Sequence, residues 1–137
     1  MSVVVTENGI GGYGQQILAD KHVLNADEPE PIGRGTAPDP YQLLLGSLGA
    51  CTSMTVRMYA ERKGWPLEKV TVTLSHQRVH SRDCEDCEDK NVMIDEITKQ
   101  IQLDGPLNDE QRAALHKIAE KCPVHRTLTG TIKIRSI

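Results

Sequence analysis

The sequence has no phenylalanine, one tryptophan and only 3% aromatic residues, and it carries no excess of basic charge. With a formal net charge of -3, it offers neither the positive footprint nor the stacking surfaces that nucleic-acid binding uses. We therefore expect no nucleic-acid partner. The apolar stretch within residues 39–64 is broken by polar and charged residues at both ends, so no membrane-spanning helix is expected either.

Signals for export, repeats and linkers are also missing. The first residues, MSVVVTENG, lack a basic region followed by an apolar core, so we expect a cytoplasmic protein. In that compartment four cysteines are more often reactive or metal-binding than permanently paired. With 137 residues and no internal repeat, the chain is expected to form a single domain, residues 1–137.

The stretch from Asp39 to Gly64 predicts one long helix with a cysteine at its middle. Asp39 suits the N-cap, Pro40 the first turn and Gly64 a left-handed stop. Helical spacing places one apolar stripe along Leu44, Leu48, Cys51, Thr55 and Met58. The opposite face is small, with Gly46, Gly49, Ser53 and Ala60. Small residues let a second backbone come close, so we expect this helix to be packed on both sides.

The rest of the chain predicts an α+β fold with mainly antiparallel strands around that central helix. Strands are expected at residues 2–7, 12–18, 22–26, 67–80, 92–103 and, at the end, 127–137. A proline-rich loop at 27–38 precedes the central helix, and a polar loop at 81–91 joins two strands. Asn108 and Gln111 form a capping pattern for a second helix, with Ala114, Leu115, Ile118 and Ala119 as its buried side and Pro123 as its end.

Two cysteines stand in different predicted surroundings. Cys51 lies in the middle of a helix and needs a cation from elsewhere to become reactive. Cys122 is expected in the last turn of the second helix, where the helix dipole disfavours a thiolate and the neighbouring Lys121, His125 and Arg126 favour it. Such a pair suggests a peroxidatic and a resolving thiol. The alternative for Cys51 is a small buried hydrophobic side chain.

Two blocks, DPYQLLLGSLGACTSM around Cys51 and KCPVHRTL around Cys122, resemble the OsmC/Ohr family, and the loop DCEDCE is similar to one OsmC-like branch. The resemblance runs from about the first strand to the end of the chain. It implies a cysteine-based peroxidase for organic hydroperoxides, in which Cys51 attacks the peroxide and Cys122 closes a disulfide. It also implies an intertwined homodimer with active sites at the subunit interface, a small or lipoyl-type dithiol as reductant, and no cofactor.

The sequence departs from that family at the groups that activate the thiol. Peroxidases of the family hold the reactive thiolate with an arginine from the N-terminal strands and a glutamate just before the central helix. Here Tyr41 stands in the glutamate's place, and no arginine precedes Arg34. Arg34 or Arg126 are therefore candidates to supply the charge, and Tyr41 a hydrogen bond. The alternative is that both arginines are ordinary surface groups.

A second cluster has the spacing His76-x3-His80-x3-Cys84-x2-Cys87. The two histidines share one face of a strand, and Cys-x2-Cys is a spacing that zinc accepts. The acidic residues around the cysteines do not fit common zinc modules. Three interpretations stay open: a metal site, a second redox pair, or a solvated loop with incidental thiols.

The sequence thus favours reduction of organic hydroperoxides in oxidative stress defence, because an apolar stripe around Cys51 suits an alkyl substrate. A rival interpretation is a non-catalytic dimer that binds a small hydrophobic ligand in the same pocket or senses oxidation. The missing arginine and glutamate favour that rival. A zinc-stabilised structural module is a third interpretation, and it depends entirely on Cys84 and Cys87.

Overall fold

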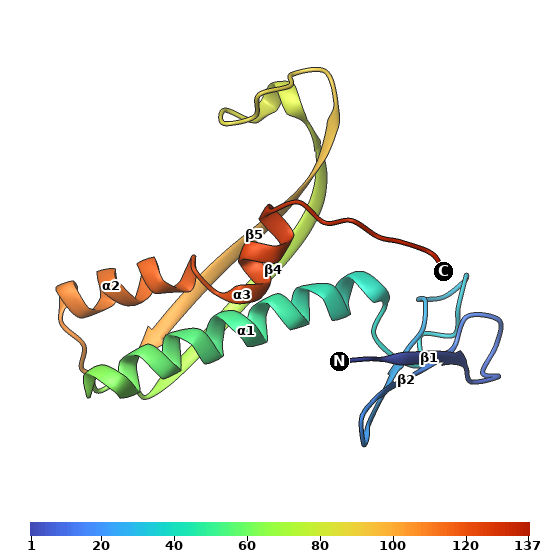
Figure 1. Ribbon diagram of the computed structural model, residues 1–137, viewed down its shortest axis with the longest axis horizontal. Coiled ribbons are helices and arrows are strands. Elements are labelled where there is room, and N and C mark those ends of the chain that lie inside the picture. Colours follow the sequence, from blue (N-terminus) through green and yellow to red (C-terminus); the bar gives the residue numbers. More distant parts are fainter. The chain divides into compact units, whose positions relative to one another are not determined.

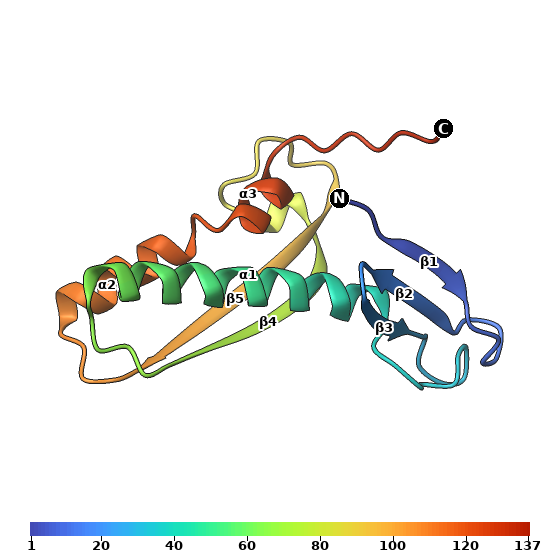
Figure 2. The same ribbon diagram turned by 60° about the horizontal axis from the view of Figure 1, so that its bottom comes forward.

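The computed structural model describes residues 1–137 (Figures 1 and 2). The chain forms two compact units, residues 1–46 and residues 47–137. The expectation of a single domain stays a prediction, and each unit is described by itself. None of the helices combines the length and the apolar character needed to cross a membrane.

The first unit contains a three-stranded antiparallel sheet in the order β1 (Val4–Glu7), β2 (Gln15–Ala19) and β3 (His22–Ala26). The three strands predicted near residues 2–7, 12–18 and 22–26 are therefore present. The first turn begins at Asn8, whose Oδ1 accepts a hydrogen bond from Ile10 N–H at 2.9 Å. Gly9 follows with a φ of 80°, a conformation that glycine adopts without steric cost.

The loop at residues 27–38 is irregular, as predicted, and it is organised by a buried carboxylate. Asp27 is 2% exposed, and its oxygens accept hydrogen bonds from Glu28 N–H at 2.8 Å, Thr36 N–H at 3.0 Å and the Thr36 hydroxyl at 2.7 Å. Hydrogen bonds from Thr36, first from its hydroxyl and then from its backbone, hold the pKa of Asp27 below its ordinary value, although burial opposes them. The carboxylate thus satisfies backbone donors that the loop itself leaves unpaired.

Helix α1 (Pro40–Lys63) begins and ends where the sequence predicted. Asp39 Oδ1 accepts from Gln42 N–H at 2.8 Å, and Gln42 Oε1 accepts from Asp39 N–H at 3.0 Å, which forms a reciprocal cap. Gly64 stops the helix with a φ of 68°.

The buried side of α1 differs from the predicted stripe. Its buried residues are spaced by four: Leu48, Thr52, Val56 and Ala60. Cys51 is only half-buried, and Met58 is 66% exposed. The prediction was wrong by about one residue around the helix because it left out Thr52, whose hydroxyl donates to Leu48 O at 2.8 Å and can therefore be buried.

Strands β4 (Lys69–His80) and β5 (Met93–Asp104) form a long antiparallel hairpin, as predicted. Alternate residues of β4 are half-buried and exposed. The small face of α1 allows a close approach to this hairpin, because a Cβ on Gly49 would lie 2.8 Å from Leu74 Cδ1. Gly46, by contrast, has open space around it.

Helix α2 (Asp109–Ala119) runs beside the C-terminal half of α1 (Figures 1 and 2). The predicted cap is confirmed: the Asn108 side chain accepts from Gln111 N–H at 2.8 Å, and the Gln111 side chain accepts from Asn108 N–H at 3.0 Å. The core of the second unit is formed by α1, α2, β5 and the adjoining turns, through Val56, Ala60, Leu67, Leu103, Leu107, Leu115 and Ala119.

The predicted strand at residues 127–137 is wrong in its first part. Pro123 does not merely end α2; it occupies the first turn of a further helix, α3 (Pro123–Thr129), which includes Thr127. Residues 131–137 have no strand assignment, and no strand of this chain pairs with them. The alternation of Ile132 and Ile134 with polar residues predicted a strand, but alternation does not provide a hydrogen-bonding partner.

We expect Thr36→Val to destabilise the protein at neutral pH, because it removes a donor to Asp27. Since the folded-state pKa of Asp27 is depressed, its contribution is present above the unfolded value of about 3.9 and is lost as pH falls through the folded value. The melting temperature of the variant should lie below that of the wild type at neutral pH, with a gap that narrows below about pH 4. Thermal unfolding followed by circular dichroism measures this, with Thr71→Val on the exposed face of β4 as control. A difference in melting temperature between Thr36→Val and the wild type that does not change with pH would contradict this prediction.

Candidate active site

Cys122 lies at the beginning of a helix and not at the end of one. Helix α2 ends at Ala119, and Cys122 is the N-cap of α3, where its Sγ accepts a hydrogen bond from His125 N–H at 3.3 Å. The expectation that a helix dipole disfavours its thiolate was therefore wrong. The physical reason is Pro123, which cannot continue α2 but is well suited to the first position of a new helix.

The Cys122 side chain is fully buried and hydrogen-bonded. Its Sγ lies 3.5 Å from Thr52 Oγ1 and also has a hydrogen bond with the Cys51 side chain. Burial is the largest single influence and raises the pKa of Cys122. Hydrogen bonds from Thr52, the His125 backbone and Cys51, together with the positive charge of Lys99, outweigh it and leave the pKa of Cys122 below its ordinary value.

The cation beside this thiol is Lys99 of β5, which is half-buried. Its ammonium group has three N–H donors and makes three contacts: Ala119 O at 2.9 Å, His125 Nδ1 at 2.9 Å and Thr52 Oγ1 at 3.3 Å. One side chain of the hairpin thus holds α1, the end of α2 and α3 together around Cys122.

The contact with Lys99 also assigns the tautomer of a neutral His125 ring. An ammonium group can only donate, so His125 Nδ1 must accept, and a neutral imidazole then carries its proton on Nε2. That nitrogen lies 3.8 Å from Glu120 Oε2. His125 therefore keeps an N–H on the side away from Lys99.

A pocket of about 200 Å³ lies beside this cluster, and Lys99 and His125 form part of its wall. The remaining lining residues are Leu48, Asp95, Ile97, Leu128 and Thr129. Neither cysteine lines the pocket. Its wall thus combines aliphatic side chains from α1, β5 and α3 with two basic groups that contact the surroundings of Cys122.

The structure brings Cys51 and Cys122 into contact. Arg126 is exposed on α3 and contacts Cys122 through its backbone, whose N–H donates to Cys122 O at 3.1 Å. Arg34 and Tyr41 belong to the first unit, so their roles stay predictions. Lys99 was not among the site residues predicted from the sequence. A signal was present, because alternation places this lysine on the same face of β5 as the apolar Ile101 and Leu103.

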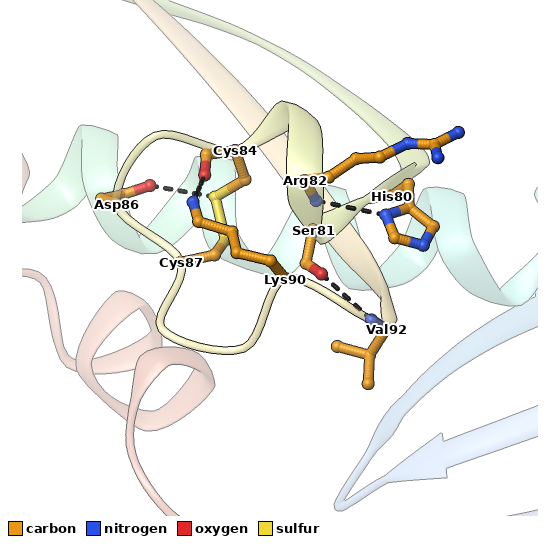
Figure 3. The surroundings of a disulfide bond; sticks show 8 residues. All are labelled: His80, Ser81, Arg82, Cys84, Asp86, Cys87, Lys90 and Val92. Atoms are coloured by element: carbon orange, nitrogen blue, oxygen red, sulfur yellow. Dashed lines mark hydrogen bonds between the residues drawn. A yellow bond between two sulfur atoms is a disulfide. The ribbon is translucent and has the colours of Figure 1, made fainter.

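The second cluster is arranged differently from the proposed set of His76, His80, Cys84 and Cys87. Cys84 and Cys87 are joined by a disulfide, and Asp86 is the third group whose ligand atom lies within 4.8 Å of theirs. The histidines have other partners. His76 Nε2 lies 2.9 Å from Asp95 Oδ1. His80 Nδ1 accepts from Arg82 N–H at 3.2 Å (Figure 3). Sulfurs in a disulfide are not thiolate ligands, so this state of the loop does not offer the expected metal site.

The fold and the paired thiols define an α+β protein with two interacting cysteines, one on a long helix and one at the start of a short helix. The model of the family of OsmC-like proteins matches residues 33–136, so the chain belongs to this family. The expected family and the expected α+β fold class are therefore confirmed, whereas the branch with the DCEDCE loop and the intertwined homodimer stay predictions. A comparison with curated protein sequences gives no match.

Solved structures share the fold at low sequence identity. An OsmC-like protein from Mycoplasma pneumoniae is 18% identical, with a TM-score of 0.73 over 94% of this chain and 86% of that one. The organic hydroperoxide resistance protein OsmC from Legionella pneumophila is 22% identical, with a TM-score of 0.65 over 95% and 90%. The organic hydroperoxide resistance protein OhrB of Bacillus subtilis is 19% identical, with a TM-score of 0.64 over 95% and 92%.

We predict that Lys99→Met raises the pKa of Cys122, because it removes the nearby positive charge. Lys99→Arg should keep the pKa lowered, and Lys117→Met on the exposed side of α2 should leave it unchanged. The pKa can be followed from the ¹³Cβ chemical shift of labelled Cys122 across pH, which does not require access to the buried sulfur. An unchanged titration in Lys99→Met would show that hydrogen bonds alone set the pKa.

Proposed function

We propose that this protein is a thiol-dependent peroxidase that reduces organic hydroperoxides through Cys51 and Cys122, in defence against oxidative stress. The observation that carries the proposal is the contact between two free thiols, one of which has a lowered pKa. Family membership supports the same chemistry, since two structural neighbours are named organic hydroperoxide resistance proteins.

In the proposed reaction the Cys51 thiolate attacks the distal oxygen of the hydroperoxide and the O–O bond breaks. The alkoxide takes up a proton and leaves as the alcohol, and Cys51 becomes a sulfenic acid. The Cys122 thiolate then attacks the Cys51 sulfur, the hydroxyl group leaves as water after protonation, and a disulfide forms. An external dithiol, of the lipoyl type or a smaller one, reduces this disulfide and is itself oxidised.

The surroundings of Cys122 suit the second of these steps. Resolution needs a thiolate within reach of the sulfenic acid, and the lowered pKa of Cys122 increases the fraction of its thiolate at a given pH. Full burial keeps that thiolate away from peroxides in solution. Of the two cysteines, the half-buried Cys51 is the more exposed residue, which supports its assignment as the group that meets the substrate.

The pocket supports an organic substrate over hydrogen peroxide. Leu48, Ile97 and Leu128 provide aliphatic surface, and burying an alkyl group against it is favourable by about 25 cal/mol per Å². Hydrogen peroxide has no alkyl group and gains nothing from this surface. Lys99 and His125 offer polar contacts on the same wall.

A homodimer is part of this proposal, in keeping with the family. On the isolated chain Met54 and Met58 of α1 are each 66% exposed, and Ile134 near the C-terminus is 93% exposed. Apolar side chains exposed to this degree are usually covered by another molecule when they form a contiguous patch. A second copy of the chain would cover them and could bring the unpaired residues 131–137 a strand partner.

A second candidate function is non-catalytic: a dimer that binds a small hydrophobic ligand or senses oxidation without turnover. The aliphatic wall of the pocket favours it, as does the absence of the family's activating arginine and glutamate. In this case Cys51 would react slowly and without preference for organic peroxides, while the pocket would still bind an apolar ligand.

We expect the reduced protein to react faster with cumene hydroperoxide than with hydrogen peroxide in a single turnover, and peptide mapping should find a Cys51 to Cys122 disulfide. Cys51→Ser should slow the reaction about a thousandfold, because a serine hydroxyl is a far weaker nucleophile at neutral pH. Cys122→Ser should leave a sulfenic acid on Cys51 that dimedone traps. Cys84→Ser with Cys87→Ser is the matched control and should react like the wild type. Slow, unselective oxidation would favour the non-catalytic function.

We expect light scattering at micromolar concentration to give twice the chain mass of 15.2 kDa. Ile134→Lys should shift the protein toward the monomer, because it places a charge in the proposed contact. Ile10→Lys, in the exposed first turn, serves as control and should leave the mass unchanged. A wild-type monomer at this concentration would refute the dimer.

A further inference from the structure

The disulfide between Cys84 and Cys87 lies in the loop that joins β4 to β5 (Figure 3). This loop begins with the short helix η1 (Ser81–Asp83). Both cysteines are half-buried, and residues 85, 86 and 88–91 around them are exposed. A thiol reagent in solution can therefore reach this pair, whereas Cys122 is fully buried.

The end of the hairpin is closed without this disulfide. Strand pairing extends to His80 and Met93, and the buried Ser81 then continues it. Ser81 N–H donates to Val92 O at 2.7 Å. Ser81 Oγ accepts from Val92 N–H at 3.0 Å (Figure 3). A disulfide between residues three apart closes a very short loop and so removes little entropy from the unfolded chain. The end of the hairpin is therefore held by hydrogen bonds that do not depend on the disulfide.

Negative charge surrounds the two sulfurs. Cys84 Sγ lies 3.1 Å from Asp86 Oδ1. Between residues 83 and 89 the loop carries five carboxylates: Asp83, Glu85, Asp86, Glu88 and Asp89. The nearby ammonium group of Lys90 donates to the backbone oxygen of Cys84 (Figure 3). The approach of an anionic thiol is thus opposed, and that of a cationic thiol is favoured.

We propose that Cys84 and Cys87 form a second thiol–disulfide exchange site, distinct from Cys51 and Cys122, whose acidic surroundings select neutral or positively charged thiols as partners. A partner thiolate attacks one loop sulfur, the loop S–S bond breaks, and the other sulfur leaves as a thiolate that takes up a proton. A second partner thiol resolves the mixed disulfide. The loop gains two electrons and two protons, and the partner becomes a disulfide. In the reverse direction a disulfide partner oxidises the loop.

Exchange can be measured on the full wild-type chain by differential alkylation and peptide mapping, which separates the loop cysteines from Cys51 and Cys122. Excess dithiothreitol, a neutral dithiol, should reduce the loop disulfide in the folded protein, and oxidised dithiothreitol should restore it after the reductant is removed. The protein should keep its circular dichroism spectrum throughout. A loop disulfide that resists the dithiol until the protein unfolds would overturn the proposal.

Selection by charge can be measured with three monothiols: cysteamine, 2-mercaptoethanol and 2-mercaptoethanesulfonate. The rates at which the three thiols open the loop disulfide are compared at equal thiolate concentration and low salt, after correction for intrinsic nucleophilicity. The rate of opening should fall in the order given, by about fivefold per unit of charge. The differences should disappear near 1 M salt, where the screening length is about 3 Å. Asp86→Asn should reduce the differences in rate among the three thiols, and Asp109→Asn on α2 should leave these differences unchanged. Equal rates at low salt would overturn the charge selection.

Metal binding is the competing outcome. The reduced protein, purified without a histidine tag, can be equilibrated with zinc alone and then exposed to oxidised dithiothreitol. The exchange site should re-form its disulfide and retain less than about 0.2 zinc per chain. Retention of one zinc per chain with Cys84 and Cys87 protected from oxidation would overturn the proposal and assign the loop to a metal. This result is independent of whether Cys51 reduces hydroperoxides.

Discussion

The ammonium group of Lys99 connects the elements that carry the thiol pair. It lies on the hairpin, and its three hydrogen bonds reach Thr52 on α1, Ala119 at the end of α2 and His125 on α3. Each of these contacts uses one of the three protons that an ammonium group has. An apolar side chain at this place would leave a carbonyl, a hydroxyl and an imidazole nitrogen without the donor that Lys99 provides in a partly buried region, and unpaired polar groups there are costly.

The ionisation of Cys122 depends on a balance between burial and the hydrogen bonds and positive charge around its sulfur. Burial alone raises the pKa of a thiol. The break between α2 and α3 turns a backbone N–H toward the sulfur, and Thr52 adds a hydroxyl. The Thr52 hydroxyl has one proton and two possible acceptors. It donates to Leu48 O, and it can donate to the Cys122 sulfur once a thiolate forms. The thiol can thus ionise inside a packed core, within reach of Cys51.

The two cysteine pairs differ in electrostatics as well as in position. Cys122 is buried beside a positive charge and contacts Cys51, which favours a reaction within the protein. Cys84 and Cys87 lie in an acidic, solvent-accessible loop, which favours exchange with molecules that come from solution. The hairpin of β4 and β5 bears both features, with Lys99 within β5 and the loop at its end. One supersecondary unit therefore carries residues of both proposed thiol sites.

Sequence by itself determined the elements whose rules are local. Asp39 and Gly64 bound α1, Asn108 and Gln111 cap α2, and the alternation along β4 and β5 gives their faces, because each depends on residues a few positions apart. The two sequence blocks around the cysteines gave the family. Tertiary structure decided the rest. Only packing shows that Thr52 is buried, that Pro123 starts a helix and so places Cys122 at its N-cap, and that Lys99 is the cation beside the thiol. A periodic pattern states which side of an element is buried, but it does not name the neighbour that satisfies each polar group there.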